Sequence, residues 1–81
     1  MKTQRTTDRE AAILKVLSEN PEGLKLSALS LKVSRLTFEN YDYNTSPRYN
    51  MDIARLLISM NKRNKIFVDT SGKEYIYKIQ K

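Results

Sequence analysis

The sequence predicts one small α+β domain in which three helices precede a C-terminal β-hairpin. A chain of 81 residues is expected to form a single core. So short a chain buries only about 60% of the surface that its unfolded form exposes and cannot divide its core further. Apolar residues make up 40% of the chain, a share typical of a folded protein. They recur at helical spacing up to about Arg63 and at strand spacing from Lys65 onward.

The first helix is expected to begin at Thr7 and to end near Glu19. Thr7 can serve as the N-cap residue while Glu10, three residues later, completes a capping box. An apolar face at helical spacing follows, formed by Ile13, Leu14, Val16 and Leu17. Residues 1–6 are therefore predicted to be a flexible N-terminal tail, and residues 7–81 to form the folded domain.

The second helix is expected to begin at Ala28, after a very short strand. The alternating triplet Leu24-Lys25-Leu26 can pair as that strand, and Ser27 is a natural N-cap residue. The helix is expected to end between Ser34 and Phe38. Its inward face is predicted from residues at i, i+4 and i+7, which are Leu29, Val33 and Leu36.

The third helix has two candidate starts. Ser46-Pro47 fits an N-cap and a first helical residue, since proline lacks the amide hydrogen that a first turn leaves without a partner. Asn50 is a competing N-cap that would leave Arg48 outside the helix. With either start, an amphipathic helix runs to about Arg63, and residues 37–45 before it have the composition of a loop. The apolar side of this helix consists of Tyr49, Ile53, Leu56, Leu57 and Met60.

The remaining residues predict a β-hairpin. Residues 66–68 form a β-prone run, residues 69–72 have turn chemistry, and residues 75–79 form a second strand. Gly72 is available for a positive φ at the tip. The strand faces that would cover the helices are formed by Ile66 and Val68 on one strand and by Tyr75, Tyr77 and Ile79 on the other.

The composition argues against several classes of function. The chain has neither Cys nor His, which removes disulfides, the usual metal ligands and the usual proton shuttle. Neighbouring acids such as Glu19 and Glu22 come without a Gly-rich phosphate loop or a metal-ligand cluster. We therefore expect no enzyme activity, cofactor, metal or small-molecule substrate. No apolar run approaches the roughly 20 residues of a membrane span, so we expect a cytoplasmic protein without membrane contact.

The positive charge is concentrated in one stretch of the chain. The net charge is +6 and the pI is about 9.7, which favours a polyanionic partner. Residues 46–65 alone carry a net charge of +4. On the third helix three cations repeat every seven residues, opposite the apolar side. This cationic stripe consists of Arg48, Arg55 and Lys62.

The order of the predicted elements resembles that of the winged helix-turn-helix family over roughly Thr7 to Ile79. Two local patterns carry the resemblance. The family's short strand and second helix match Gly23-Leu24-Lys25-Leu26-Ser27 with Leu29 and Val33, and its recognition helix matches Ser46-Pro47 with Leu56, Leu57 and Met60. The hairpin after Asn64 resembles the wing. In one respect the chain departs from the family, since roughly nine to eleven residues separate the second and third helices instead of three or four.

The resemblance implies a transcription regulator that binds double-stranded DNA through the third helix, as a homodimer on paired half-sites. Arg48 and Asn50 are the base-reading candidates, because Arg pairs with guanine and Asn with adenine. Further cations would contact phosphates. Asp69 and Glu74 offset the charge of Lys73, so the hairpin tip is expected to bind DNA only weakly. The candidate DNA-binding residues are Ser46, Arg48, Asn50, Arg55, Ser59, Lys62, Arg63, Lys65 and Lys73.

An alternative interpretation is a winged-helix protein-interaction module or a small phage-type adaptor, in which the stripe is only a solvated surface. Tyr41 and Tyr43 share a loop with acids such as Glu39, whose charge opposes nucleic acid and suits a protein partner. Met51 and Ile58 lie on the outward side of the third helix. There they would be exposed unless they contact thymine methyl groups, the 37–45 insertion or another subunit, and we expect a packing contact.

Overall fold

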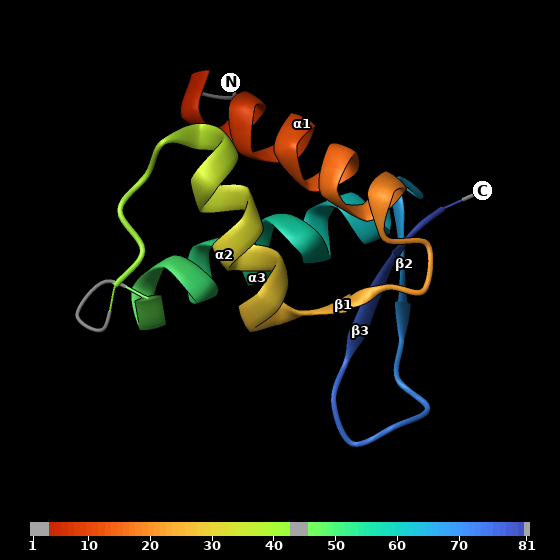
Figure 1. Cartoon of the computed structure of the whole chain (residues 1–81). Coiled ribbons are helices and arrows are strands. Elements are labelled where there is room, and N and C mark those ends of the chain that lie inside the picture. Colours follow the sequence, from red (N-terminus) through yellow and green to blue (C-terminus); the bar gives the residue numbers. More distant parts are fainter. Residues whose placement is uncertain (1–3, 43–45, 81) are drawn as a thin grey trace.

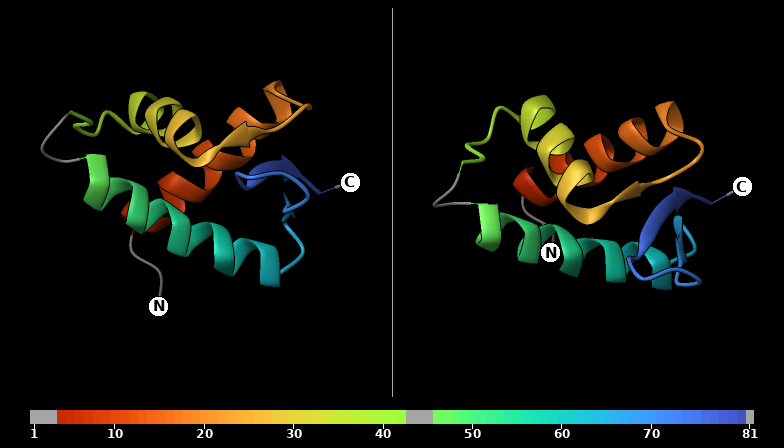
Figure 2. Two further views of the ribbon diagram at one scale, coloured as in Figure 1. Left: turned by 90° about the horizontal axis from the view of Figure 1, so that it is seen from below. Right: turned by 60° about the horizontal axis from the view of Figure 1, so that its bottom comes forward.

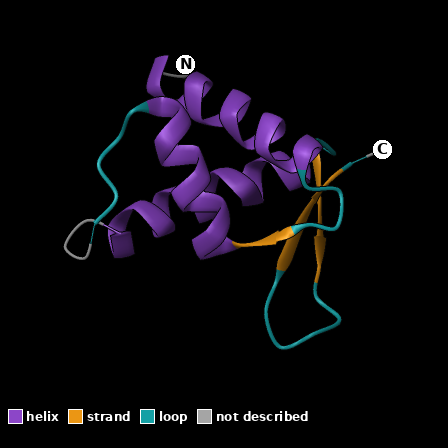
Figure 3. Cartoon of the chain, viewed as in Figure 1, coloured by secondary structure: helices purple, strands orange, loops and turns teal. Residues whose placement is uncertain are grey.

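The computed structural model describes residues 4–42 and 46–80, and within these ranges the chain forms three helices and one three-stranded antiparallel sheet. The helices lie together, with the sheet at one end of the group (Figures 1 and 3). The predicted α+β class is confirmed. The elements in chain order are α1 (Gln4–Glu19), β1 (Leu24–Lys25), α2 (Leu26–Thr37), α3 (Ser46–Lys62), β2 (Ile66–Asp69) and β3 (Ile76–Ile79).

The core lies where the three helices meet the inner face of the sheet. Its fully buried members come from every helix and from β2, and they include Ile13, Leu17, Leu29, Val33, Ile53, Leu57, Met60 and Ile66. Burying side chains of this size contributes about 1.5–3 kcal/mol each. The helical spacing thus predicts the inward faces of α1 and α3 correctly.

The inward face of α2 differs from the prediction at one residue. Leu36 is 41% exposed, whereas Ser30 and Ser34 are buried. The buried face is centred between Val33 and Ser30, which leaves Leu36 at its edge in the last turn. A prediction from hydrophobic residues alone misplaces the inward face of α2, because small serine side chains can also line a contact between helices.

The sheet has β3 in its centre, with β1 and β2 on either side. Ile66 pairs with Ile79 and Val68 pairs with Tyr77, so one face of the hairpin covers the helices as predicted. The prediction for Tyr75 is wrong, since its side chain is 59% exposed. The β2–β3 ladder ends at the pair of Asp69 and Ile76, so the alternation of the strand does not extend to Tyr75.

Two helix starts differ from the predictions. The first helix begins at Gln4 and not at Thr7, which places Thr7 inside the first turn and excludes the proposed capping box. The second helix begins at Leu26, with Lys25 as its N-cap residue and no side-chain cap, so Ser27 is not the N-cap. Pairing of β1 with β3 holds Lys25 extended, and the helix begins directly after it.

The start of α3 at Ser46 agrees with the first of the two predicted starts and keeps Arg48 inside the helix. The connection from α2 to α3 spans residues 38–45, of which residues 43–45 lie outside the described ranges. The connection begins at Phe38, which caps α2 in the left-handed conformation with φ 57° and ψ 33°.

Glycine is required in the turn between α1 and β1 and not at the hairpin tip. Gly23 has φ 92°, and a Cβ atom there would lie 2.5 Å from Cγ2 of Ile76 in β3. Gly72 does not adopt a positive φ, contrary to the prediction. Instead, the carboxylate of Asp69 accepts a hydrogen bond of 2.9 Å from the backbone N–H of Ser71, which turns the chain without a left-handed residue.

Candidate nucleic-acid interface

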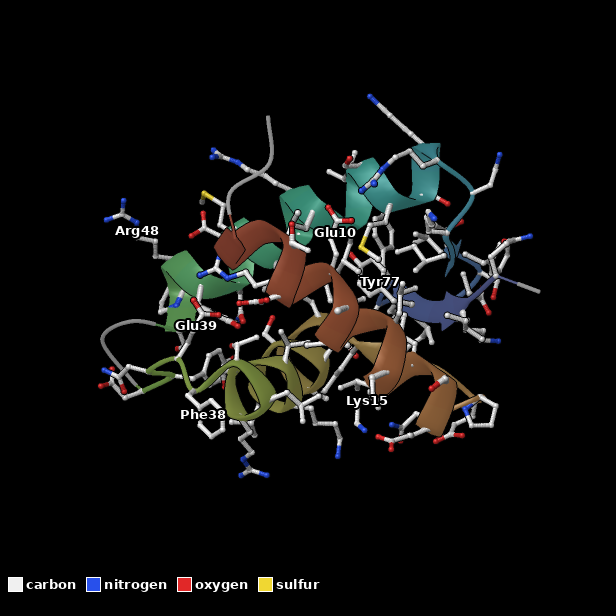
Figure 4. All side chains as sticks on the ribbon, turned by 90° about the horizontal axis from the view of Figure 1, so that it is seen from above. Glu10, Lys15, Phe38, Glu39, Arg48 and Tyr77 are labelled. Atoms are coloured by element: carbon white, nitrogen blue, oxygen red, sulfur yellow. The ribbon has the colours of Figure 1, made fainter. Side chains whose placement is uncertain are left out.

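The three residues of the cationic stripe are exposed along the outer side of α3. Their positions lie opposite the buried Ile53 and Met60 of the same helix. Figure 2 shows α3 along one side of the molecule with the hairpin near its C-terminal end. In Figure 4 the side chain of Arg48 points away from the other elements. Among the described residues, no acid forms an ion pair with Arg48, Arg55 or Lys62, so the stripe is available to a polyanion.

Other predicted DNA-binding residues extend this surface only in part. Ser59 and Lys65 are exposed near the C-terminal end of α3. Lys73 is exposed on the separate hairpin tip. Ser46 is half-buried, and its backbone N–H donates a hydrogen bond of 2.8 Å to the carbonyl of Asp42, which fixes the first turn of α3.

Arg63 is engaged within the protein. Its Nη2 lies 3.1 Å from Oε2 of Glu10 in α1, and its Nε donates to the carbonyl of Ser59 at 3.3 Å. The side chain of Glu10 is largely buried, so this pair joins α1 to the end of α3. The predicted phosphate contact of Arg63 would compete with this ion pair. The residue expected to complete a capping box, Glu10, is instead its partner.

Asn50, the second base-reading candidate, is held by the connection between α2 and α3. The hydroxyl of Tyr41 donates a hydrogen bond of 2.9 Å to Oδ1 of Asn50. This bond holds the side chain of Asn50 against Tyr41 of the connection. The side chain is half-buried and faces the hairpin side of α3 rather than the stripe.

A polar cluster that the sequence analysis did not predict anchors the same connection. Glu39 accepts hydrogen bonds from Arg9 in α1 (2.7 Å), Thr37 in α2 (2.7 Å) and the hydroxyl of Tyr49 in α3 (2.9 Å). The guanidinium of Arg9 also lies 4.8 Å from the centre of the Tyr49 ring. We name these four residues the Glu39 cluster. Figure 4 shows Glu39 pointing inward between the helices.

The Glu39 cluster shifts the titration of two of its members. Partial burial on its own would raise the pKa of Glu39, but the hydrogen bonds from Arg9, Thr37 and Tyr49 outweigh it and lower the pKa to about 2. Burial, together with the hydrogen bond to Glu39, raises the pKa of Tyr49 to about 12. Near neutral pH, Glu39 is therefore a charged acceptor at the centre of the cluster.

The Glu39 cluster bears on the role expected for the 37–45 insertion. Glu39 is not a free surface acid, since its charge is matched inside the domain. Tyr41 is half-buried, and its ring packs edge to face on Tyr49 at a centroid distance of 5.6 Å, so part of its surface is used within the domain. Tyr43 lies outside the described residues. Among the described residues of this connection, Phe38 has an aromatic side chain that projects, and it is 96% exposed (Figure 4).

The expected packing of Met51 and Ile58 does not occur within the described part of the chain, where they are 57% and 58% exposed. Ile58 lines a groove between α3 and the β2–β3 hairpin, which has a volume of about 470 Å³. We name it the hairpin groove. Tyr75 lines its other wall. In the sequence, the sign of this groove is Ile58, an apolar residue on the outward side of α3.

Comparisons of the chain with protein-family models, curated proteins and solved structures gave no match. None of the helices in the described ranges has both the length and the apolar character that crossing a membrane requires. Across the same ranges, no three acids gather as a metal site would need. The function is therefore proposed from the positions and contacts of the chain's own residues.

Proposed function

We propose that this chain is a winged-helix protein that binds double-stranded DNA and regulates transcription in the cytoplasm, without a cofactor. The observation that carries the proposal is the exposed cationic stripe, whose residues Arg48, Arg55 and Lys62 all belong to one helix. A helix with cations along its solvent side suits the major groove, where phosphates flank the base edges on both sides.

The order of the elements supports this proposal. After α1 come a short strand, two helices and a terminal hairpin, which is the order of elements in a winged helix. The hairpin takes the place of the wing. The connection of residues 38–45 is longer than a standard turn between the two helices. The Glu39 cluster ties this connection to α1 and α3, so the extra length does not leave the start of α3 without support.

Within this proposal the residues have different roles. Arg48 at the first turn of α3 is the strongest candidate for reading a base, because its side chain extends into solvent. Arg55, Lys62 and Lys65 would contact phosphates. Asn50 can read a base only if its bond to Tyr41 opens, and Arg63 can reach a phosphate only if it leaves Glu10.

The test is a triple substitution of Arg48, Arg55 and Lys62 by Ala, with duplex DNA binding measured over a salt series. Each lost phosphate contact should flatten the slope of log K against log salt by roughly 0.9, and a lost base contact should weaken binding by about 1–3 kcal/mol. The same titrations give the number of protein chains per duplex, for which we expect two.

A matched control removes the same charge elsewhere. Lys15, Lys32 and Arg35 are exposed on α1 and α2, away from the stripe, and their replacement by Ala should leave the salt slope nearly unchanged. Both triple variants should fold, because surface substitutions usually alter stability by no more than about 0.5 kcal/mol each. Equal DNA binding by the parent and the stripe variant across the salt series would show that the stripe is only a solvated surface.

A further inference from the structure

The hairpin groove differs in chemistry from the cationic stripe beside it. Its walls are mostly apolar, with Ala54 and Ile58 on the side of α3 and Val68 and Tyr75 on the side of the hairpin. A second cavity of about 370 Å³ adjoins it, since Tyr75 and Tyr77 line both. Together they follow α3 from Asn50 to Asn61, a length of about 16 Å at 1.5 Å per residue.

Two exposed apolar side chains on opposite walls make this groove a suitable place for an apolar group. Ile58 is 58% exposed and Tyr75 is 59% exposed, although both line the same cavity. Filling the space between them with an apolar side chain would remove surface of both from water, which is favourable. A phosphate backbone would gain nothing from the apolar residues of these walls.

The charges at the groove favour an acidic occupant. Arg55 precedes Ile58 by three residues and Lys62 follows it by four, so both are its neighbours on the helix surface. Both cations are exposed, and Lys62 lines the groove itself. In the adjoining cavity, the charges of the lining residues Lys25 and Glu74 offset each other. The open edge of the groove is therefore positive.

The same charges argue against a second copy of this chain in the groove. Two copies that met through this face would place Arg55 and Lys62 of one against Arg55 and Lys62 of the other. Like charges brought together at an interface oppose association. A partner that carries carboxylates beside its apolar side chains has no such penalty.

We infer that the hairpin groove binds a short acidic amphipathic segment of a partner protein. One or two large apolar side chains of that segment lie between Ile58 and Tyr75, and its carboxylates lie against Arg55 and Lys62. A helix of about 12 residues matches the length of the groove. This inference goes beyond DNA binding and does not depend on it. Because the two surfaces share Arg55 and Lys62, the segment and DNA would bind in competition.

The test uses a fluorescent synthetic peptide of about 12 residues with Leu and Phe at positions i and i+4 and acidic residues on the remaining faces. Fluorescence anisotropy measures its binding to the full chain. Two control peptides replace every acid by Lys or replace Leu and Phe by Ser. We expect the acidic peptide to bind and both controls to bind at least about tenfold more weakly.

Substitutions then locate the peptide. Ile58→Ser and Tyr75→Ser should each weaken peptide binding about tenfold and change duplex DNA binding by less than about twofold. Met51→Ser is the matched control, because Met51 is a similarly exposed apolar residue of α3, 57% exposed, that does not line the groove. It should leave peptide affinity unchanged. Circular dichroism of each variant checks that the chain is folded.

Several results would overturn the inference. Among them are an acidic peptide that does not bind, a Lys peptide that binds equally well, and equal effects of Met51→Ser and Ile58→Ser. If Ile58→Ser weakens DNA binding as much as peptide binding, DNA occupies this face. If it instead breaks a dimer seen by sedimentation, a second copy does. Peptide binding without any salt-dependent DNA binding would disprove the proposed function and support this one.

Discussion

Phe38 ends α2 in a backbone conformation that disfavours residues with a Cβ atom, and its large apolar ring is exposed. It adopts a left-handed φ of 57° at the end of α2, and its side chain is 96% exposed. For residues with a Cβ atom this conformation costs about 1–2 kcal/mol, which is why glycine is preferred at such helix ends. Neither packing nor backbone preference explains a phenylalanine here.

We therefore predict that Phe38→Gly raises the free energy of unfolding by about 1 kcal/mol. Phe38→Ala is the control, because it removes the ring but keeps the Cβ atom, and it should change stability by less than about 0.5 kcal/mol. Urea unfolding of the three proteins measures both effects. A loss of stability in the glycine variant would mean that the ring packs on the domain in solution.

Side chains from all three helices hold the start of the connection between α2 and α3 through Glu39. Arg9 and Glu39 are 30 residues apart in sequence, and their side chains are 13% and 17% exposed. Removing Arg9 takes away the guanidinium that pairs with the largely buried Glu39, and removing Glu39 leaves Arg9 with only the longer ion pair to Asp52 at 3.9 Å. Either loss is more costly than losing a surface ion pair.

Glu39→Ala and Arg9→Ala are each predicted to lower the free energy of unfolding by about 2–3 kcal/mol. The double variant should lose clearly less than the sum of the two, because each single change already breaks the same contacts. Glu22→Ala, at an exposed acid in the turn after α1, serves as the control and should stay within about 0.5 kcal/mol of the parent. Additive effects of the two single changes would show that the pair is not coupled.

For the whole molecule, the Glu39 cluster predicts how stability depends on pH. The pKa of Glu39 falls from 4.5 to about 2 on folding, so its contribution is present above pH 4.5 and is lost as the pH falls toward 2. The pKa of Tyr49 rises from 10.0 to about 12, so its contribution is present below pH 10 and is lost as the pH rises toward 12.

We expect the parent protein to lose about 2–3 kcal/mol more stability than Glu39→Gln between pH 5 and pH 2, since glutamine does not titrate. Unfolding in urea at a series of pH values gives this difference directly. Because every other acid is common to both proteins, their titration cancels in the comparison. Parallel pH profiles for the two proteins would show that Glu39 has an ordinary pKa in the folded state.

The features that depend on spacing along one element follow from the sequence alone. Helical periodicity predicts the buried sides of α1 and α3 and the stripe of Arg48, Arg55 and Lys62, because residues three, four or seven positions apart share one side of any helix. Alternation places Val68 and Tyr77 on the inner face of the hairpin for the same reason. These predictions need no knowledge of how the elements are arranged.

Which side chains from different elements meet depends on how the elements pack together in the folded chain. The sequence assigned Glu10 to a helix cap, Glu39 to a solvated loop and Tyr75 to the core. In the folded chain, Glu10 pairs with Arg63, Glu39 with Arg9, and Tyr75 faces Ile58 across a groove. Each outcome depends on the angles and distances at which helices and hairpin pack, and those follow from the fit of all core side chains at once.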